Sequence, residues 1–179
     1  FKARHGLDQP IVVQYARWLG RVATLDFGRS LHDGRQVGDQ LFEALPRTLL
    51  LSSLSLFFAV AIAIPLGVVL AVRHGQPLAR VVSGSLFVAY ALPSFWVAVM
   101  LLLALATDHG WALFPLQGLT GVPADAPVLV RLGDLLRHLV LPVACLSYPL
   151  TVVLTRHVKS AMRDALSQEY VRAARARGV

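Results

Sequence analysis

Apolar residues in this chain are gathered into three long blocks, separated by polar or proline-rich stretches. The blocks run over about residues 49–72, 81–106 and 135–155. Each block is as long as the roughly 20 residues of helix that cross the hydrocarbon core of a bilayer. A buried helix of a soluble protein explains one such block but not three of them. The pattern therefore predicts three transmembrane helices.

Proline lies inside each predicted span, next to glycine or to polar side chains. Pro65 and Gly67 favour a kink or a tight helix contact in the first span. The second contains YALPSFW and the third contains CLSYPLT. Polar groups at membrane depth need protein partners or a water-filled path. We expect a translocation path near Tyr90, Ser94, Trp96, Ser147 and Tyr148. Simple packing between helices is an equally good interpretation of each of these residues.

Residues 1–46 are polar and rich in turn signals, and they precede a predicted transmembrane domain over residues 47–179. Within them, IVVQYARWLGRV places apolar and aromatic residues at helical spacing, which predicts an amphipathic helix. A second short helix is expected over residues 37–44, followed by a turn at Pro46. We expect this region to be extracytoplasmic. Contact with lipid and a soluble capping layer are both open.

Composition agrees with a membrane protein, because 56% of the 179 residues are hydrophobic and only 15% are charged. The net charge is +7, but the basic residues flank the apolar blocks and are not interleaved with aromatic residues. We therefore expect lipid and no nucleic acid as a partner. The single cysteine, Cys145, lies in an apolar block, and the six histidines lack metal-binding spacing. No metal and no cofactor are expected.

The loop RHGQPLAR between the first two spans is short and basic. Short basic loops favour the cytoplasmic side of a membrane. With three spans, the C-terminal tail lies on the same side as this loop, and the long loop after residue 106 lies on the other side.

The tail is predicted to form an amphipathic helix over about residues 162–178, with Leu166, Tyr170, Ala173 and Ala174 on one side. Its arginines do not share one polar face, so a partner protein fits this helix better than a lipid surface. Small alanines let another backbone approach closely. Gly178 permits a sharp turn after the helix.

The segment AARARG resembles the cytoplasmic coupling loop, often called the EAA loop, of binding-protein-dependent ABC-transporter permeases. QEYVRAARARGV is similar to the version in dipeptide and oligopeptide permeases. Three further segments resemble that family in the same order: LDQPIVVQYARWLGRVATLDFGRSLHDGRQV, LPRTLLLSSLSL and ALPSFWVAVML. One position departs from the motif, because Arg172 stands where the family has its glutamate, while Glu169 lies three residues earlier.

The resemblance implies an all-α, polytopic transmembrane helical bundle of the ABC importer permease type. About three spans and amphipathic helices of it are expected in this chain, which we interpret as a fragment. The implied location is the bacterial inner membrane. The implied partners are a second permease subunit, cytoplasmic ATP-binding subunits and an extracytoplasmic solute-binding protein. The residues implied in coupling to the ATPase are Glu169, Tyr170, Arg172, Ala173, Ala174, Arg177 and Gly178.

The resemblance implies a transport subunit for peptides or related small solutes, and not an enzyme. The chain contains no GxxxxGK[ST] phosphate loop, so ATP hydrolysis would belong to separate subunits. A secondary carrier or channel is the main alternative, but no acidic or basic residue lies at the centre of a span. An intramembrane enzyme is a third reading, but no span pairs a nucleophile with a base or a metal-ligand set.

Overall fold

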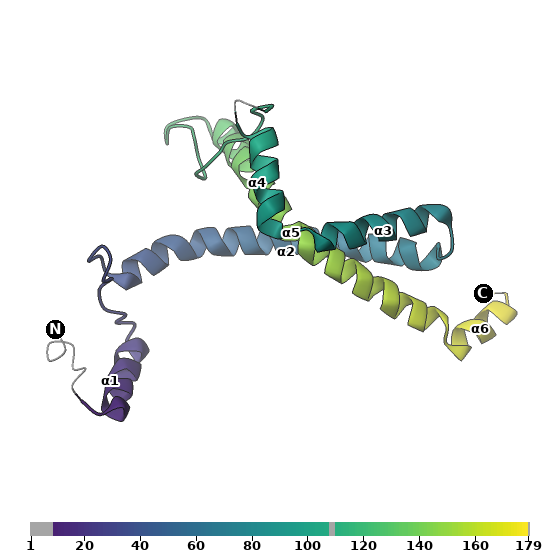
Figure 1. The fold of residues 1–179 in the computed structure, drawn as a ribbon, viewed down its shortest axis with the longest axis horizontal. Helices are drawn as coiled ribbons and strands as arrows, with labels where there is room; N and C mark the ends of the chain where they lie inside the picture. Colours follow the sequence, from purple (N-terminus) through teal and green to yellow (C-terminus); the bar gives the residue numbers. More distant parts are fainter. Residues whose placement is uncertain (1–8, 108–109, 179) are drawn as a thin grey trace. The chain divides into compact units, whose positions relative to one another are not determined.

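The computed structural model describes residues 9–107 and 110–178, and every named element in this part is a helix. This confirms the predicted all-α fold class. The chain divides into two compact units, residues 1–50 and 51–179, and each is described by itself. The helices, drawn in Figure 1, are α1 (Ile11–Ala23), α2 (Val37–Val72), α3 (Pro77–Ala91), α4 (Ser94–Leu105), α5 (Val128–Leu166) and α6 (Glu169–Ala176).

The first unit contains α1 and the start of α2. None of the α1 residues is buried, and the rings of Tyr15 and Trp18 lie 5.8 Å apart on its exposed apolar side. The loop before α2 is tied to that helix, because Arg35 forms a 2.9 Å salt bridge with Glu43. The amphipathic helix predicted in this region is therefore present.

Helix α2 is one continuous helix from Val37 to Val72, so the separate short helix and the turn expected at Pro46 are wrong. A proline inside a helix removes one backbone hydrogen bond. Helix propagation is cooperative, so residues on both sides of the proline sustain the helix across the missing bond. Helical structure also continues through Pro65, where a kink was one of the expected outcomes.

In the second unit, α2 and α5 are each long and apolar enough to cross a membrane. The predicted second span, residues 81–106, is not one straight helix. It consists of α3 and α4, which meet at an angle of 97° (Figure 1). Leu92 and Pro93 are extended at the break, because proline lacks an N–H group and disfavours helical geometry in the residue before it. The described part thus has two membrane-spanning helices, or three if the bent pair is one span.

Small residues on α2 recur every four positions and are buried along one face: Ser55, Ala59, Ala63, Gly67 and Ala71. A Cβ atom at Gly67 would lie 2.7 Å from Cβ of Val158 and 3.0 Å from the carbonyl oxygen of Thr155, both on α5. The two backbones therefore approach closely at this glycine, as small residues allow in membrane proteins. The tight helix contact expected at Gly67 is confirmed.

Helix α5 has 39 residues, which corresponds to about 58 Å at roughly 1.5 Å per residue. It therefore extends beyond the predicted third span, residues 135–155, at both ends. The helix predicted over residues 162–178 is not continuous, because α5 ends at Leu166 and α6 begins at Glu169. The Ser167 hydroxyl donates to the Asp164 carbonyl at 2.8 Å, and Gln168 is extended. Such a local side-chain bond competes with the helical ladder and favours a helix end.

Candidate functional site

The break between α3 and α4 is held by a side chain of α5. The Tyr148 hydroxyl donates a 3.0 Å hydrogen bond to the carbonyl oxygen of Leu92, the residue at which α3 ends. A backbone carbonyl freed at membrane depth needs a partner within the protein. Tyr148 supplies that partner, so this predicted path residue stabilises the bent pair.

A second aromatic residue of the predicted path contacts a cation on α5. The guanidinium carbon of Arg156 lies 5.9 Å from the ring centroid of Tyr90, within the range of a cation–π interaction. Tyr90 lies in the last turn of α3 and is otherwise exposed. Together with the Tyr148 bond, this contact joins the C-terminal end of α3 to α5 beside the α3–α4 break.

The remaining predicted path residues do not gather at one point. Ser147 is buried in the packed interior, where its hydroxyl donates to the Ala144 carbonyl at 3.3 Å. Ser94 and Trp96 lie in the first turn of α4 and are exposed. The structure therefore places Tyr90 and Tyr148 at the helix break, while the Ser147 side chain is buried and bonded within α5.

Helix α6 carries the residues predicted to couple the chain to an ATPase. None of its residues is buried, and the side chain of Tyr170 is 68% exposed. Gly178 follows the helix with a φ of +82°, in the left-handed region that favours glycine. The amide N–H of Gly178 donates to the Arg175 carbonyl at 3.1 Å. The structure thus presents a short exposed helix followed by a left-handed glycine; the turn at Gly178 agrees with the sequence prediction, whereas the predicted helix over residues 162–178 is divided.

The opposite end of α5 is tied to the long loop after α4. The Gly121 amide donates to Oδ2 of Asp134 at 2.7 Å, and Nη2 of Arg137 donates to the Leu113 carbonyl at 3.4 Å. His138 is buried, and its Nδ1 lies 2.8 Å from the Asp134 carbonyl oxygen. These contacts fix the loop on the first turns of α5.

Sequence reasoning missed the role of basic residues on α5. Arg156 and Lys159 were interpreted only as flanking charges that set the topology. In the structure Arg156 contacts Tyr90, and Nζ of Lys159 donates to the Ser83 hydroxyl at 2.8 Å. Three basic residues share one face of α5 by their spacing: Arg156, Lys159 and Arg163. This spacing could have indicated from the sequence that they act together.

Comparison with known proteins agrees with these features. Residues 63–179 match the family described as the binding-protein-dependent transport system inner membrane component. This match includes most of the membrane-spanning part and all of α6. The chain belongs to this family. It is therefore an inner-membrane component of a transport system and not an enzyme, which confirms the family, the location and the class of function predicted from the sequence.

Two relatives illustrate the similarity of this chain to curated permease proteins. It is 35% identical over 179 residues to the oligopeptide transport system permease protein AppB of Bacillus subtilis, covering 99% of this chain and 55% of AppB. It is 32% identical over 177 residues to the inner membrane ABC transporter permease protein YejB of Escherichia coli O157:H7, covering 98% of this chain and 49% of YejB. The chain spans about half the length of these curated relatives.

Proposed function

We propose that the permease is the membrane-spanning subunit of an ABC importer for peptides or related small solutes. In this proposal it contributes to the translocation path and couples that path to separate ATP-hydrolysing subunits. The observation that carries the proposal is α6, an exposed helix directly after a membrane-spanning helix, ended by the left-handed Gly178. An exposed amphipathic helix in this position is suited to docking a partner protein.

The contacts of α5 give coupling a structural route. Helix α6 follows α5 after the two residues Ser167 and Gln168. Along its length α5 contacts α2 at Gly67, and it holds the α3–α4 break through Tyr148. A partner that moves α6 therefore acts on a helix that touches the other membrane helices of this unit. Coupling requires that the partner binds the two conformations of the permease with different affinity.

The proposed partners follow from this role. Cytoplasmic ATP-binding subunits would dock on α6, and the docking set comprises Glu169, Tyr170, Arg172, Ala173, Ala174, Arg177 and Gly178. A second permease subunit would complete the path across the membrane. An extracytoplasmic solute-binding protein would deliver the substrate and set its identity.

The proposed path runs beside the α3–α4 break. Tyr90, Ser94 and Trp96 are exposed there and supply aromatic and hydroxyl groups without a full charge. Uncharged groups of this kind suit a passage for peptides of varied sequence. Tyr148 positions the break, and the burial of Ser147 favours a packing role for that side chain.

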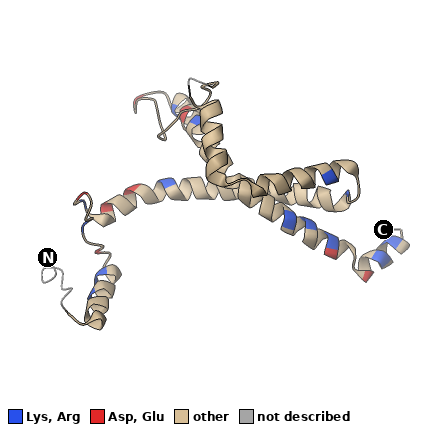
Figure 2. Ribbon diagram, in the orientation of Figure 1, with Lys and Arg blue, Asp and Glu red and all other residues tan. Residues whose placement is uncertain are grey.

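Topology follows from the basic residues. Figure 2 shows Lys and Arg on the C-terminal part of α5 and on α6, while α4 carries no charged residue. Leu70 of α2 and Arg163 of α5 line one pocket, so the turn after α2 lies near the C-terminal end of α5. Basic residues near span ends favour the cytoplasm. We therefore assign the α2–α3 turn and α6 to the cytoplasmic side.

The proposal is tested by changing the docking surface of the full-length protein. Ala174→Glu and Gly178→Arg should insert into the membrane normally but bind the ATP-binding subunits at least about tenfold more weakly. Overpacking a close interface costs about 1–3 kcal/mol, and 1.4 kcal/mol corresponds to a factor of ten. Co-purification of the subunits and transport-coupled ATP hydrolysis in proteoliposomes measure the effect.

Two controls separate docking from general damage to α6. Arg175→Glu places a glutamate on the side of the helix opposite the docking set and should keep coupling. Gly178→Asn places a residue that tolerates the left-handed conformation, so it should retain most of the activity lost in Gly178→Arg. Normal transport by both Ala174→Glu and Gly178→Arg would refute the docking role of α6.

A further inference from the structure

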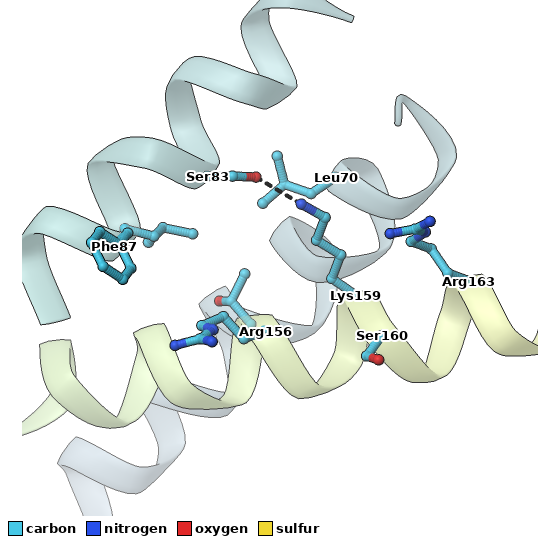
Figure 3. A pocket seen from close by; sticks show the side chains of 9 residues that line it. Leu70, Ser83, Phe87, Arg156, Lys159, Ser160 and Arg163 are labelled. Carbon is cyan, nitrogen blue, oxygen red and sulfur yellow. Dashed lines mark hydrogen bonds between the residues drawn. The ribbon is translucent and has the colours of Figure 1, made fainter. Parts of the chain in front are cut away.

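A pocket of about 250 Å³ lies between the end of α2, helix α3 and the C-terminal part of α5. Three of its lining residues are cations on α5: Arg156, Lys159 and Arg163. They are spaced three and four positions apart, so they share one face of the helix. Figure 3 shows Lys159 reaching from α5 to Ser83 of α3, with Arg156 and Arg163 on either side of it.

In the part of the chain that the structure describes, Lys159 and Arg156 contact neutral groups, and no salt bridge involves Arg163. Lys159 donates to the Ser83 hydroxyl at 2.8 Å, and Arg156 lies over the Tyr90 ring. In the described ranges, Glu43 pairs with Arg35 and the Asp134 carboxylate lies 3.5 Å from His138, and no acidic side chain pairs with these cations. Like charges close together repel each other and attract an anion. The pocket therefore has the electrostatics of an anion site.

The other side of the same pocket is apolar. Leu70 of α2 and Leu86 and Phe87 of α3 line it, and the side chain of Phe87 is 65% exposed. A free inorganic anion gains nothing from such a wall. A phospholipid does, because its phosphate contacts the cations while its acyl chain covers the apolar side chains.

The pocket also lies at the depth where lipid phosphates are found. The apolar stretch of α5 ends at Arg156, and Arg80 stands one turn before Ser83 on α3. Between Arg137 and Arg156, α5 carries no Lys, Arg, Asp or Glu, and Figure 2 shows Lys and Arg on its C-terminal part beyond this uncharged stretch. A change from apolar to basic residues marks the boundary between the hydrocarbon core and the headgroups.

We propose that this pocket binds an anionic phospholipid, with its phosphate held by Lys159, Arg163 and Arg156 and its acyl chain against Phe87. The lipid belongs to the leaflet on the side of the α2–α3 turn. By bridging α3 and α5 just before α6, it stabilises the arrangement of these helices. The site requires membrane insertion, which family membership establishes, and does not depend on which solute is transported.

The test measures lipid binding to the full-length permease in its assembled complex, after removal of native lipid. Dioleoyl phosphatidylglycerol is titrated and counted by native mass spectrometry, with dioleoyl phosphatidylcholine as the zwitterionic reference. The double variant Lys159→Gln/Arg163→Gln should lose about tenfold or more in phosphatidylglycerol affinity. The matched control Arg29→Gln/Arg131→Gln removes two exposed charges elsewhere and should stay within about twofold of wild type.

The apolar wall is tested with the headgroup alone. Phe87→Ala should weaken phosphatidylglycerol binding about threefold or more and leave the weak binding of sn-glycerol 3-phosphate unchanged. Equal affinity for phosphatidylglycerol and for sn-glycerol 3-phosphate or inorganic phosphate would make this a free-phosphate site and overturn the lipid proposal.

Two further outcomes are informative. Unchanged phosphatidylglycerol affinity in the double variant would also overturn the proposal, and would point to an acidic protein segment as the occupant of the pocket. If the double variant does not assemble, Arg163→Gln alone should lower the affinity about threefold, and Lys159→Arg should keep it. Failure of both expectations would reject the lipid site, whereas transport assays report separately on the proposed function.

Discussion

The two ends of α5 differ in how their polar groups find partners. At the N-terminal end, Asp134 and Arg137 bind the loop that follows α4, and His138 contacts the Asp134 carbonyl within α5. At the C-terminal end, Arg156, Lys159 and Arg163 line a pocket with neutral partners. Helix α6, which follows that end, has no buried residue.

The N-terminal end of α5 therefore contributes mainly to stability, and its C-terminal end with α6 is suited to binding other molecules. Polar groups that are satisfied inside the chain contribute to stability, and their loss leaves a partner unpaired. Exposed apolar and basic groups, such as those of α6, are available to other molecules. We therefore expect substitutions at the N-terminal end of α5 to affect stability, and those on α6 to affect binding.

The largest effect is expected where the chain's own packing is tightest. Gly67→Leu should lower the free energy of unfolding by about 3 kcal/mol, at the upper end of the range for overpacking, because Val158 and Thr155 leave no room for a Cβ atom. Gly84→Leu is the matched control, since nothing lies within 4 Å of its Cβ position. Thermal unfolding in detergent measures both variants. Equal stability of the two would show that α2 and α5 do not pack at Gly67.

A smaller effect is expected at the N-terminal end of α5, where Asp134 binds the loop after α4. Asp134→Ala leaves the Gly121 amide and the buried His138 ring without their carboxylate neighbour, at a cost of about 2 kcal/mol. Hydrogen exchange of residues 110–127 should rise accordingly, while ATPase association should not change. Asp125→Ala, in the same loop but exposed, should leave exchange near that of the unaltered protein. Lost ATPase association in Asp134→Ala would contradict the division between the two ends.

The smallest effect is expected at the helix break. Tyr148→Phe removes the hydroxyl that donates to the Leu92 carbonyl and should cost about 1 kcal/mol of stability. Tyr15→Phe alters an exposed tyrosine and should cost nothing measurable. A Tyr148→Phe protein as stable as Tyr15→Phe would show that another group satisfies this carbonyl.

The sequence predicts much of this fold because the strongest signals are local. The apolar blocks predicted the spans, the small side chain of Gly67 predicted a close contact, and Gly178 predicted a left-handed turn. The sequence YALPSFW places a proline inside the predicted second span, but the 97° angle at this point was not predicted. That angle depends on packing against α5, which no local pattern records.

The parts that could not be predicted depend on residues far apart in the chain. Helix α2 continues through Pro46 because cooperative helix formation outweighs the one backbone hydrogen bond that the proline removes. The contact of Tyr90 with Arg156 and the bond between Ser83 and Lys159 require α3 and α5 to lie side by side. Periodicity identified the helices, but it did not show which of their faces meet.

The central claim is that α6 docks the ATP-binding subunits, and cross-linking tests it most directly. In a full-length permease with Cys145→Ser, one cysteine is placed on α6 (Ala173→Cys) and another, in a separate variant, in the exposed loop at the far end of α5 (Asp125→Cys). The assembled complex is treated with a short maleimide–succinimidyl ester, which joins the permease cysteine to a lysine amine of a neighbouring subunit. The account predicts a permease–ATPase product from position 173 and none from position 125. No product from position 173, or a product from position 125, would contradict it.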